Sequence, residues 1–107
     1  MNNPLIIGSN GFVAAIDRES GRELWRTALK QGIMGGRSRT GVTVLVVDGQ
    51  VFAGSYGHLF CLDLESGAVL WKNEMPSMGY NDVSLAVEGV SIQFVKKIIH
   101  SQSHATT

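Results

Sequence analysis

Leu-Ile-Ile-Gly-Ser-Asn-Gly-Phe-Val-Ala-Ala-Ile-Asp-Arg-Glu-Ser-Gly-Arg-Glu-Leu-Trp-Arg, at residues 5–26, has a second copy in the same chain. Residues 51–72 read Val-Phe-Ala-Gly-Ser-Tyr-Gly-His-Leu-Phe-Cys-Leu-Asp-Leu-Glu-Ser-Gly-Ala-Val-Leu-Trp-Lys, and the two segments align without a gap at an offset of 46 residues. Nine positions are identical, and they include a pair of tryptophans and three pairs of glycines. Such a match shows an internal repeat, which is the signature of a repeat architecture.

Each unit of the repeat has the pattern of a short antiparallel meander. In the second unit, apolar and β-branched residues at 42–47 precede Asp48-Gly49, a dipeptide typical of two-residue hairpin turns. The rest of that unit alternates strands and turns, with strands at 51–55, 59–63 and 69–73 and turns at 56–57 and 65–67. Four short strands in a period of 46 residues are typical of a β-propeller blade.

The first unit lacks the strand that opens the second one. Moving back 46 residues from Asp48-Gly49 leads to Asn2-Asn3, so the first unit starts at its hairpin turn. Residues 83–87, followed by Glu88-Gly89, resemble residues 43–47 followed by Asp48-Gly49. We therefore expect an all-β fold of two four-stranded antiparallel propeller-type blades, the first completed by a C-terminal strand at about 83–87. This strand would pair beside residues 5–9, within the chain or across a subunit boundary, and so cover an open sheet edge.

The repeated positions resemble the tryptophan-docking motif of quinoprotein-type (PQQ-like) β-propeller repeats. The motif spaces a small residue, an aspartate, a glycine and a tryptophan in the same way in both units. Its positions are Ala15, Asp17, Gly21 and Trp25 in the first unit, and Cys61, Asp63, Gly67 and Trp71 in the second. The resemblance covers roughly residues 5–75 and concerns fold rather than activity.

The resemblance implies that Trp25 and Trp71 pack between neighbouring blades, with Ala15 or Cys61 kept small beneath a ring. Some relatives are dehydrogenases that bind pyrroloquinoline quinone (PQQ) and calcium in a ring of eight blades. The residues that hold those cofactors lie outside the repeat motif, and none can be transferred to this chain. We therefore expect no cofactor and no metal site, and PQQ with calcium only if the chain is part of such an enzyme.

Composition excludes several classes of protein. Nine basic and nine acidic residues give a formal net charge of zero, which argues against binding nucleic acid or an anionic membrane. The single cysteine, Cys61, excludes an intramolecular disulfide, and its place in an apolar strand favours an inert buried thiol. No apolar run is long enough to span a bilayer. The start of the chain shows no signal peptide, so we expect a cytoplasmic protein, or a periplasmic one if the true start lies upstream.

The candidate functional residues are few. Arg37 and Arg39 lie in a glycine-rich loop at residues 31–41, where two guanidinium groups could bind a phosphate or carboxylate, although pairing with acidic neighbours is the simpler reading. Asp17 and Asp63 could form a pair of carboxylates for acid–base chemistry, but each precedes a turn that ends in glycine, which favours a structural Asx-type turn. We identify no catalytic residue.

These observations predict a two-blade domain at residues 1–100 and a disordered tail at 101–107, with helix or strand left open for 90–99. Two blades are too few for a closed ring, which leaves three outcomes: a homo-oligomer, a two-sheet sandwich or a truncated gene product. Four copies would give eight blades. The predicted function is a non-catalytic interaction or scaffold module, with its protein partner unknown. The alternative is a fragment or homo-oligomerising unit of a PQQ-dependent dehydrogenase.

Overall fold

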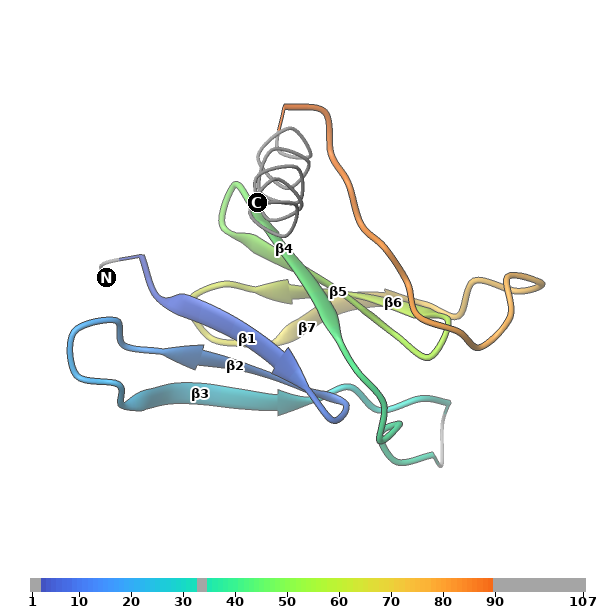
Figure 1. Ribbon diagram of the computed structural model, residues 1–107, viewed down its shortest axis with the longest axis horizontal. Coiled ribbons are helices and arrows are strands. Elements are labelled where there is room, and N and C mark those ends of the chain that lie inside the picture. Colours follow the sequence, from blue (N-terminus) through green and yellow to red (C-terminus); the bar gives the residue numbers. More distant parts are fainter. Residues whose placement is uncertain (1–2, 33–34, 90–107) are drawn as a thin grey trace, which may run out of the picture.

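Seven strands form two antiparallel sheets in the computed structural model, which describes residues 3–32 and 35–89 and contains no helix within them. The first sheet has the order β1-β2-β3, with β1 at Leu5–Ser9, β2 at Phe12–Ile16 and β3 at Glu23–Ala28. The second has the order β4-β5-β6-β7, with β4 at Thr43–Val47, β5 at Gln50–Ser55, β6 at His58–Asp63 and β7 at Val69–Asn73. The predicted all-β fold of propeller-type meanders is confirmed (Figure 1).

The repeat is reproduced down to its irregularities. Strands β1, β2 and β3 correspond to β5, β6 and β7, and each third strand pairs with the second through a shift in register at the same place. The shift lies between Ala15 and Ile16 in the first sheet and between Cys61 and Leu62 in the second. Such a bulge changes the direction of the side chains that follow it. It sets Trp25 opposite Ala15 and Trp71 opposite Cys61.

The hairpin turns explain why glycine occurs where it does. At each turn both central residues have positive φ, which is the backbone of a type I′ turn and matches the twist of the flanking strands. The pairs are Asn10 (53°) with Gly11 (76°), Asp48 (50°) with Gly49 (77°), and Tyr56 (51°) with Gly57 (77°). Glycine at the second position removes most of the steric cost of this conformation.

The core lies between the two sheets, which stack as layers in Figure 1. Alternation along the strands directs one face of each sheet inward. The buried residues that form the cluster are Val13, Leu29, Val51, Ala53, Phe60 and Leu62. Partly buried side chains of both sheets, Ile6 and Trp25 from the first and Val44 and Leu64 from the second, pack against them. The first sheet therefore covers only one face of the second.

The expectation that residues 83–87 complete the first blade is wrong for the single chain. The first sheet has three strands, and residues 83–87 belong to neither sheet. The reason is the route of the chain after each blade. Gly11 N–H donates to Thr40 O (3.0 Å), and Gly57 N–H donates to Asn81 O (2.9 Å) in the equivalent place.

The parallel route continues for two more residues. A Cβ at Gly8 would lie 2.8 Å from Val42 Cγ1, and a Cβ at Gly54 would lie 2.7 Å from Val83 Cγ1. Residue 42 leads directly into β4, the first strand of the next blade. Residues 83–87 therefore run forward, to the place where a further blade would begin, and not back to β1.

No helix of the described residues is both long and apolar enough to cross a membrane. The predictions for residues 90–99 and 101–107 lie outside the described part of the chain.

Candidate functional site

Trp25 joins the two sheets. It lies on β3 opposite Ala15, which is small and fully buried. Its indole Nε1 donates a hydrogen bond to the backbone oxygen of Leu64 in the second sheet, at 3.0 Å. The side chain is half-buried and packs against the core cluster. A packed indole ring whose N–H is hydrogen-bonded across the interface holds the two sheets together through both packing and a polar contact.

Gly67 receives the ring of Trp25. This glycine is buried and has a φ of 78°, and a Cβ built there would overlap the ring atoms Cδ2 and Cε3 of Trp25. The oxygen of Gly67 accepts a hydrogen bond from Thr27 Oγ1 at 2.6 Å. We call this set, Trp25 and Thr27 against residues 64–67, the docking contact. It shows why the position needs glycine: both the backbone angle and the approach of the ring require it.

The turn that receives the tryptophan is held in shape by its own aspartate. Ser66 donates from its backbone nitrogen and from its hydroxyl to Asp63 Oδ2, both at 2.9 Å. Gly67 N–H then donates to Asp63 O at 2.8 Å. These bonds favour the ionised carboxyl, so the backbone and side-chain bonds from Ser66 lower the pKa of Asp63.

The equivalent turn in the first sheet has the same construction. Ser20 Oγ donates to Asp17 Oδ2 at 2.7 Å, and Gly21 N–H donates to Asp17 O at 2.8 Å. The hydroxyl bond from Ser20, followed by the backbone bond from Glu19, lowers the pKa of Asp17. Both aspartates therefore lie in Asx-type turns, and the structure places them in separate sheets rather than side by side.

These pKa values predict a loss of stability in acid. Each carboxyl has a lower pKa in the folded chain than its usual value of about 3.9, so its contribution is complete above that value and disappears as the pH falls through the folded pKa. Urea unfolding followed from pH 7 downward should show stability falling below about pH 4. The double variant Asp17→Asn/Asp63→Asn should have a flatter acid dependence than the wild type. An unchanged dependence would contradict this assignment.

Trp71 is the counterpart of Trp25, but no turn receives it within the described residues. Its side chain is 42% exposed, and its ring lies 6.1 Å from that of Phe52, centroid to centroid. Cys61 lies opposite it and is fully buried, and this burial raises the pKa of the thiol. Trp71 thus differs from the sequence-based expectation that both tryptophans pack between blades.

Residues 85–87 border the same surface. They line a pocket of about 210 Å³ together with side chains from the outward face of the second sheet: Leu45, Phe52, Leu59 and Trp71. We call this surface, the outward face of the second sheet with residues 83–87, the Trp71 face.

The turn at residues 17–21 is the counterpart of the receiving turn, and no side chain of the described part of the chain docks on it. Gly21 has a φ of 78°, like Gly67, but it is exposed, and a Cβ built there would meet nothing within 4 Å. Within residues 3–32 and 35–89, one docking contact is therefore complete, and Trp71 and the turn at 17–21 are the two separate halves of a second one.

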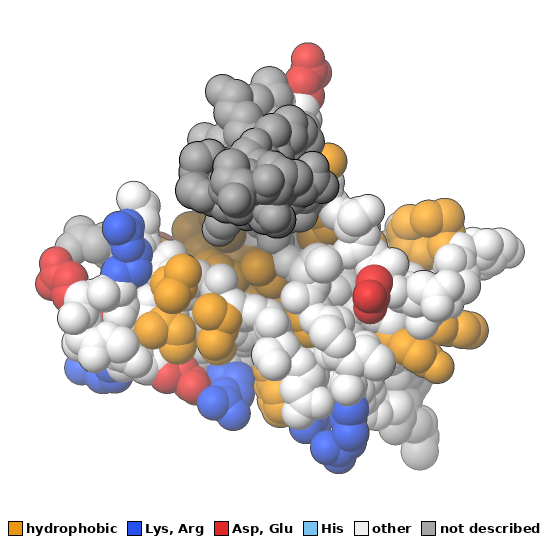
Figure 2. Space-filling view, in the orientation of Figure 1, with side chains coloured by type: hydrophobic (Ala, Val, Ile, Leu, Met, Phe, Trp, Pro, Cys, Tyr) orange, Lys and Arg blue, Asp and Glu red, His pale blue; other side chains and the backbone are white. Residues whose placement is uncertain are grey.

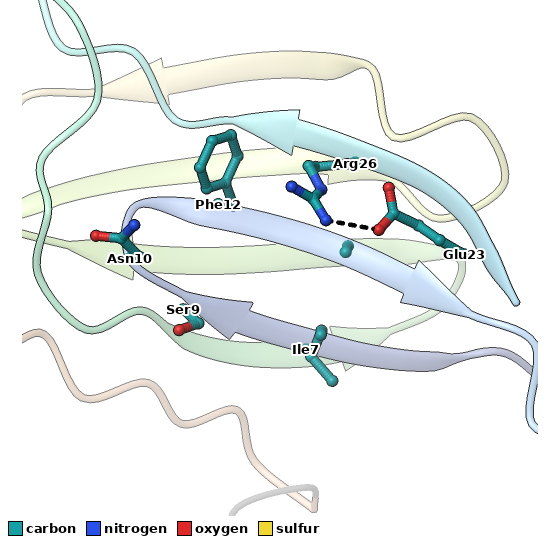
Figure 3. A pocket seen from close by; sticks show the side chains of 7 residues that line it. Ile7, Ser9, Asn10, Phe12, Glu23 and Arg26 are labelled. Atoms are coloured by element: carbon teal, nitrogen blue, oxygen red, sulfur yellow. Dashed lines mark hydrogen bonds and ion pairs between the residues drawn. The ribbon is translucent and has the colours of Figure 1, made fainter. Parts of the chain in front are cut away.

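The outward face of the first sheet is apolar along β1. Leu5 is 52% exposed and Ile7 is 43% exposed. Figure 2 shows hydrophobic side chains gathered over this part of the molecule, with acidic and basic side chains at their border. In Figure 3, Ile7 and Phe12 lie on the viewed face of the sheet beside Arg26, which forms an ion pair with Glu23 at 2.8 Å. We call this surface, with the turn at 17–21, the β1 face.

A sequence model of the family described as outer membrane protein assembly factor BamB matches residues 9–99. The chain belongs to this PQQ-like repeat family. The match includes both copies of the docking motif, from Ala15 to Trp71. A comparison with curated proteins finds no match.

The two arginines of the predicted anion loop have different surroundings in this PQQ-like repeat chain. The guanidinium of Arg37 lies 4.1 Å from the centroid of the Phe12 ring, and its Nε donates to Asn10 O at 2.9 Å. Arg39 is exposed. Stacking on a ring and a backbone bond use much of the binding capacity of Arg37. Anion binding by this pair stays a prediction.

An aromatic group that sequence reasoning missed lies beside β6. Tyr56 and Tyr80 stack at 5.2 Å between centroids, and His58 lies 6.3 Å from Tyr80. His58 and Tyr80 line a pocket with residues 74–77 and Gly79. Tyr80 lies outside the internal alignment of residues 5–26 with residues 51–72, so comparing the two copies could not place it. Within the described residues, no group of three or more His, Cys, Asp or Glu side chains could hold a metal ion.

Proposed function

We propose that the chain is a non-catalytic β-propeller-type interaction module, whose outward sheet faces bind protein. The observation that carries this proposal is the exposure of large apolar side chains on the outward faces of both sheets. On the second sheet Trp71 is 42% exposed, and on the first sheet Leu5 is 52% exposed. Exposed apolar surface of this kind is typical of protein-binding sites.

Two further observations support an interaction role. The docking contact shows that a tryptophan on this scaffold can bind a prepared turn, because Trp25 does so inside the chain. Burial of an indole removes about 150–250 Å² from water, so an exposed tryptophan offers a large gain on binding. The description of the matched family names an outer membrane protein assembly factor, and a non-catalytic interaction module is compatible with that description.

The experiment that tests this proposal also tests the alternative, a unit of a PQQ-dependent dehydrogenase. The protein is titrated with PQQ and calcium and followed by absorbance, and dye-linked oxidation of alcohols and sugars is assayed with the same samples. We expect neither saturable binding nor oxidation. Stoichiometric binding accompanied by oxidation would overturn the proposal.

A further inference from the structure

We infer that a second copy of this chain docks head to tail on the first, its β1 face against the Trp71 face. The residues 83–87 of the first copy then supply the missing first strand of the second copy's three-stranded sheet. The inference rests on the proposed interaction role and names the partner. It starts from the docking contact, which the described residues complete once, between Trp25 and Gly67, and leave divided once, between Trp71 and Gly21.

The offset of 46 residues predicts the bonds of the second contact. Trp25 Nε1 donates to Leu64 O, so Trp71 Nε1 would donate to the oxygen of Arg18 in the second copy. Thr27 Oγ1 donates to Gly67 O, so Asn73 would donate to the oxygen of Gly21. Asn73 Oδ1 already accepts from Met75 N–H at 2.8 Å, an arrangement that leaves the two N–H donors of the amide for that bond.

The apolar surfaces also correspond, position by position. Inside the chain, Ile6 and Val13 of the first sheet face the inward side chains of the second sheet. Their counterparts on the Trp71 face are Phe52 and Leu59, which are larger. On the β1 face, the counterpart of Phe60 is Ala14, which is smaller. Phe52 and Leu59 would therefore pack against Ala14 of the second copy. The larger side chains on one surface compensate for the smaller one on the other, so the total side-chain volume at the interface is similar.

The sheet edges fit in the same way. In the second sheet β5 pairs with β4, whereas β1, the counterpart of β5, has no partner on its outer edge within the described residues. Residues 83–87 leave the second sheet by the route that residues 42–47 take from the first. Thr43 Oγ1 donates to Val83 O and holds the start of this segment. A copy docked on the Trp71 face would present its open β1 edge to residues 83–87, and an open edge can recruit such a segment as a strand.

A contact of this type joins two different surfaces, so it can propagate from copy to copy until a ring closes. Each copy contributes two blades, and propellers hold about 4–8 blades, so a closed ring needs two to four copies. Light scattering of the full chain should therefore give a mass of two to four times 11.5 kDa.

Two variants each disrupt one side of the contact between copies. Trp71→Ala removes the tail half, and Gly21→Asn places a Cβ where the ring of Trp71 would lie while keeping a residue that tolerates positive φ. Each variant alone should have the mass of one chain. Mixed in equal amounts, they should form a complex of two chains and no larger one, because each supplies one intact half. A contact between like surfaces predicts no such rescue.

The controls change matched positions away from the two faces. Val69→Ala alters a side chain of similar exposure, 43%, on the same strand as Trp71 but opposite Leu62, which faces the first sheet. Gly32→Asn alters a glycine with a φ of 73° and open space around its Cβ. Both should keep the wild-type mass, and circular dichroism checks that the monomeric variants remain folded.

A wild-type chain that is monomeric at high micromolar concentration would overturn the inference, and so would mixed variants that stay monomeric. These failures are distinguishable from failure of the proposed function. A monomer that binds no PQQ removes self-docking alone, whereas PQQ-dependent oxidation removes the interaction role whatever the mass.

Discussion

Trp25→Ala should bring the protein close to unfolding, whereas Trp71→Ala should leave the isolated chain folded. Trp25 packs on the core and bonds Leu64 O in the other sheet, so its truncation removes the link between the two layers. Truncating a core tryptophan costs about 3–5 kcal/mol, and domains of this size are stable by about 5–15 kcal/mol. Trp71 is 42% exposed, and its ring lies 6.1 Å from that of Phe52 in its own sheet and lines a pocket with residues 85–87.

Urea unfolding of the two variants, followed by circular dichroism, measures this difference. The two tryptophans occupy the same position of the repeat, so each variant is the natural control for the other. Trp25→Phe separates packing from the hydrogen bond, because phenylalanine keeps a ring but has no N–H. Its loss of stability should be smaller than that of Trp25→Ala. Equal losses for Trp25→Ala and Trp71→Ala would show that docking between the sheets is not what stabilises the chain.

Gly67→Ala should destabilise the chain far more than Gly21→Ala. Both glycines have a φ of 78°, so alanine carries the same backbone cost of about 1–2 kcal/mol at either position. Only at Gly67 does the new Cβ overlap the ring of Trp25, which must then move away from Leu64 O. The difference in stability between the two variants therefore measures how much the packing of the Trp25 ring against the turn at 63–67 contributes. The same comparison in a Trp71→Ala background excludes any contribution from docking between chains.

Thermal unfolding at one fixed protein concentration is the measurement. Gly21→Ala should shift the melting temperature by a few degrees, and Gly67→Ala should shift it by substantially more. If the two shifts agree, the turn at 63–67 accommodates a side chain beneath Trp25 and the docking contact is looser than its geometry indicates.

The repeat made most of the architecture predictable. Seven strands lie where alternation and turn residues place them, because Asp48-Gly49 is a preferred type I′ pair and Gly11 and Gly57 supply the second positive φ at the other two hairpin turns. The structural surroundings of the motif residues follow from the same source. Asp17 and Asp63 bond their own turns, a local interaction with the serine three residues away and with neighbouring backbone N–H groups.

The prediction for residues 83–87 shows that a local sequence pattern does not determine the tertiary position of a segment. Their likeness to residues 43–47 predicted a strand beside residues 5–9, but within the single chain residues 83–87 belong to neither sheet. The direction of the chain is set by the backbone hydrogen bond from Gly57 N–H to Asn81 O and by the close approach of the Val83 side chain to Gly54. Both contacts join residues that are far apart in the sequence. The stacking of Arg37 on Phe12 and of Tyr56 on Tyr80 likewise joins residues that no repeat or spacing connects.

The two tryptophans show the difference between what the sequence determines and what the tertiary structure determines. Sequence alone establishes that Trp25 and Trp71 are equivalent, since strand, bulge and spacing are encoded locally and twice. Only the stacking of the sheets makes them different: Trp25 has a second sheet in front of it and Trp71 does not, within the described residues. Burial depends on what lies across an interface, and a repeat specifies the surface that each unit offers without specifying which surface meets it.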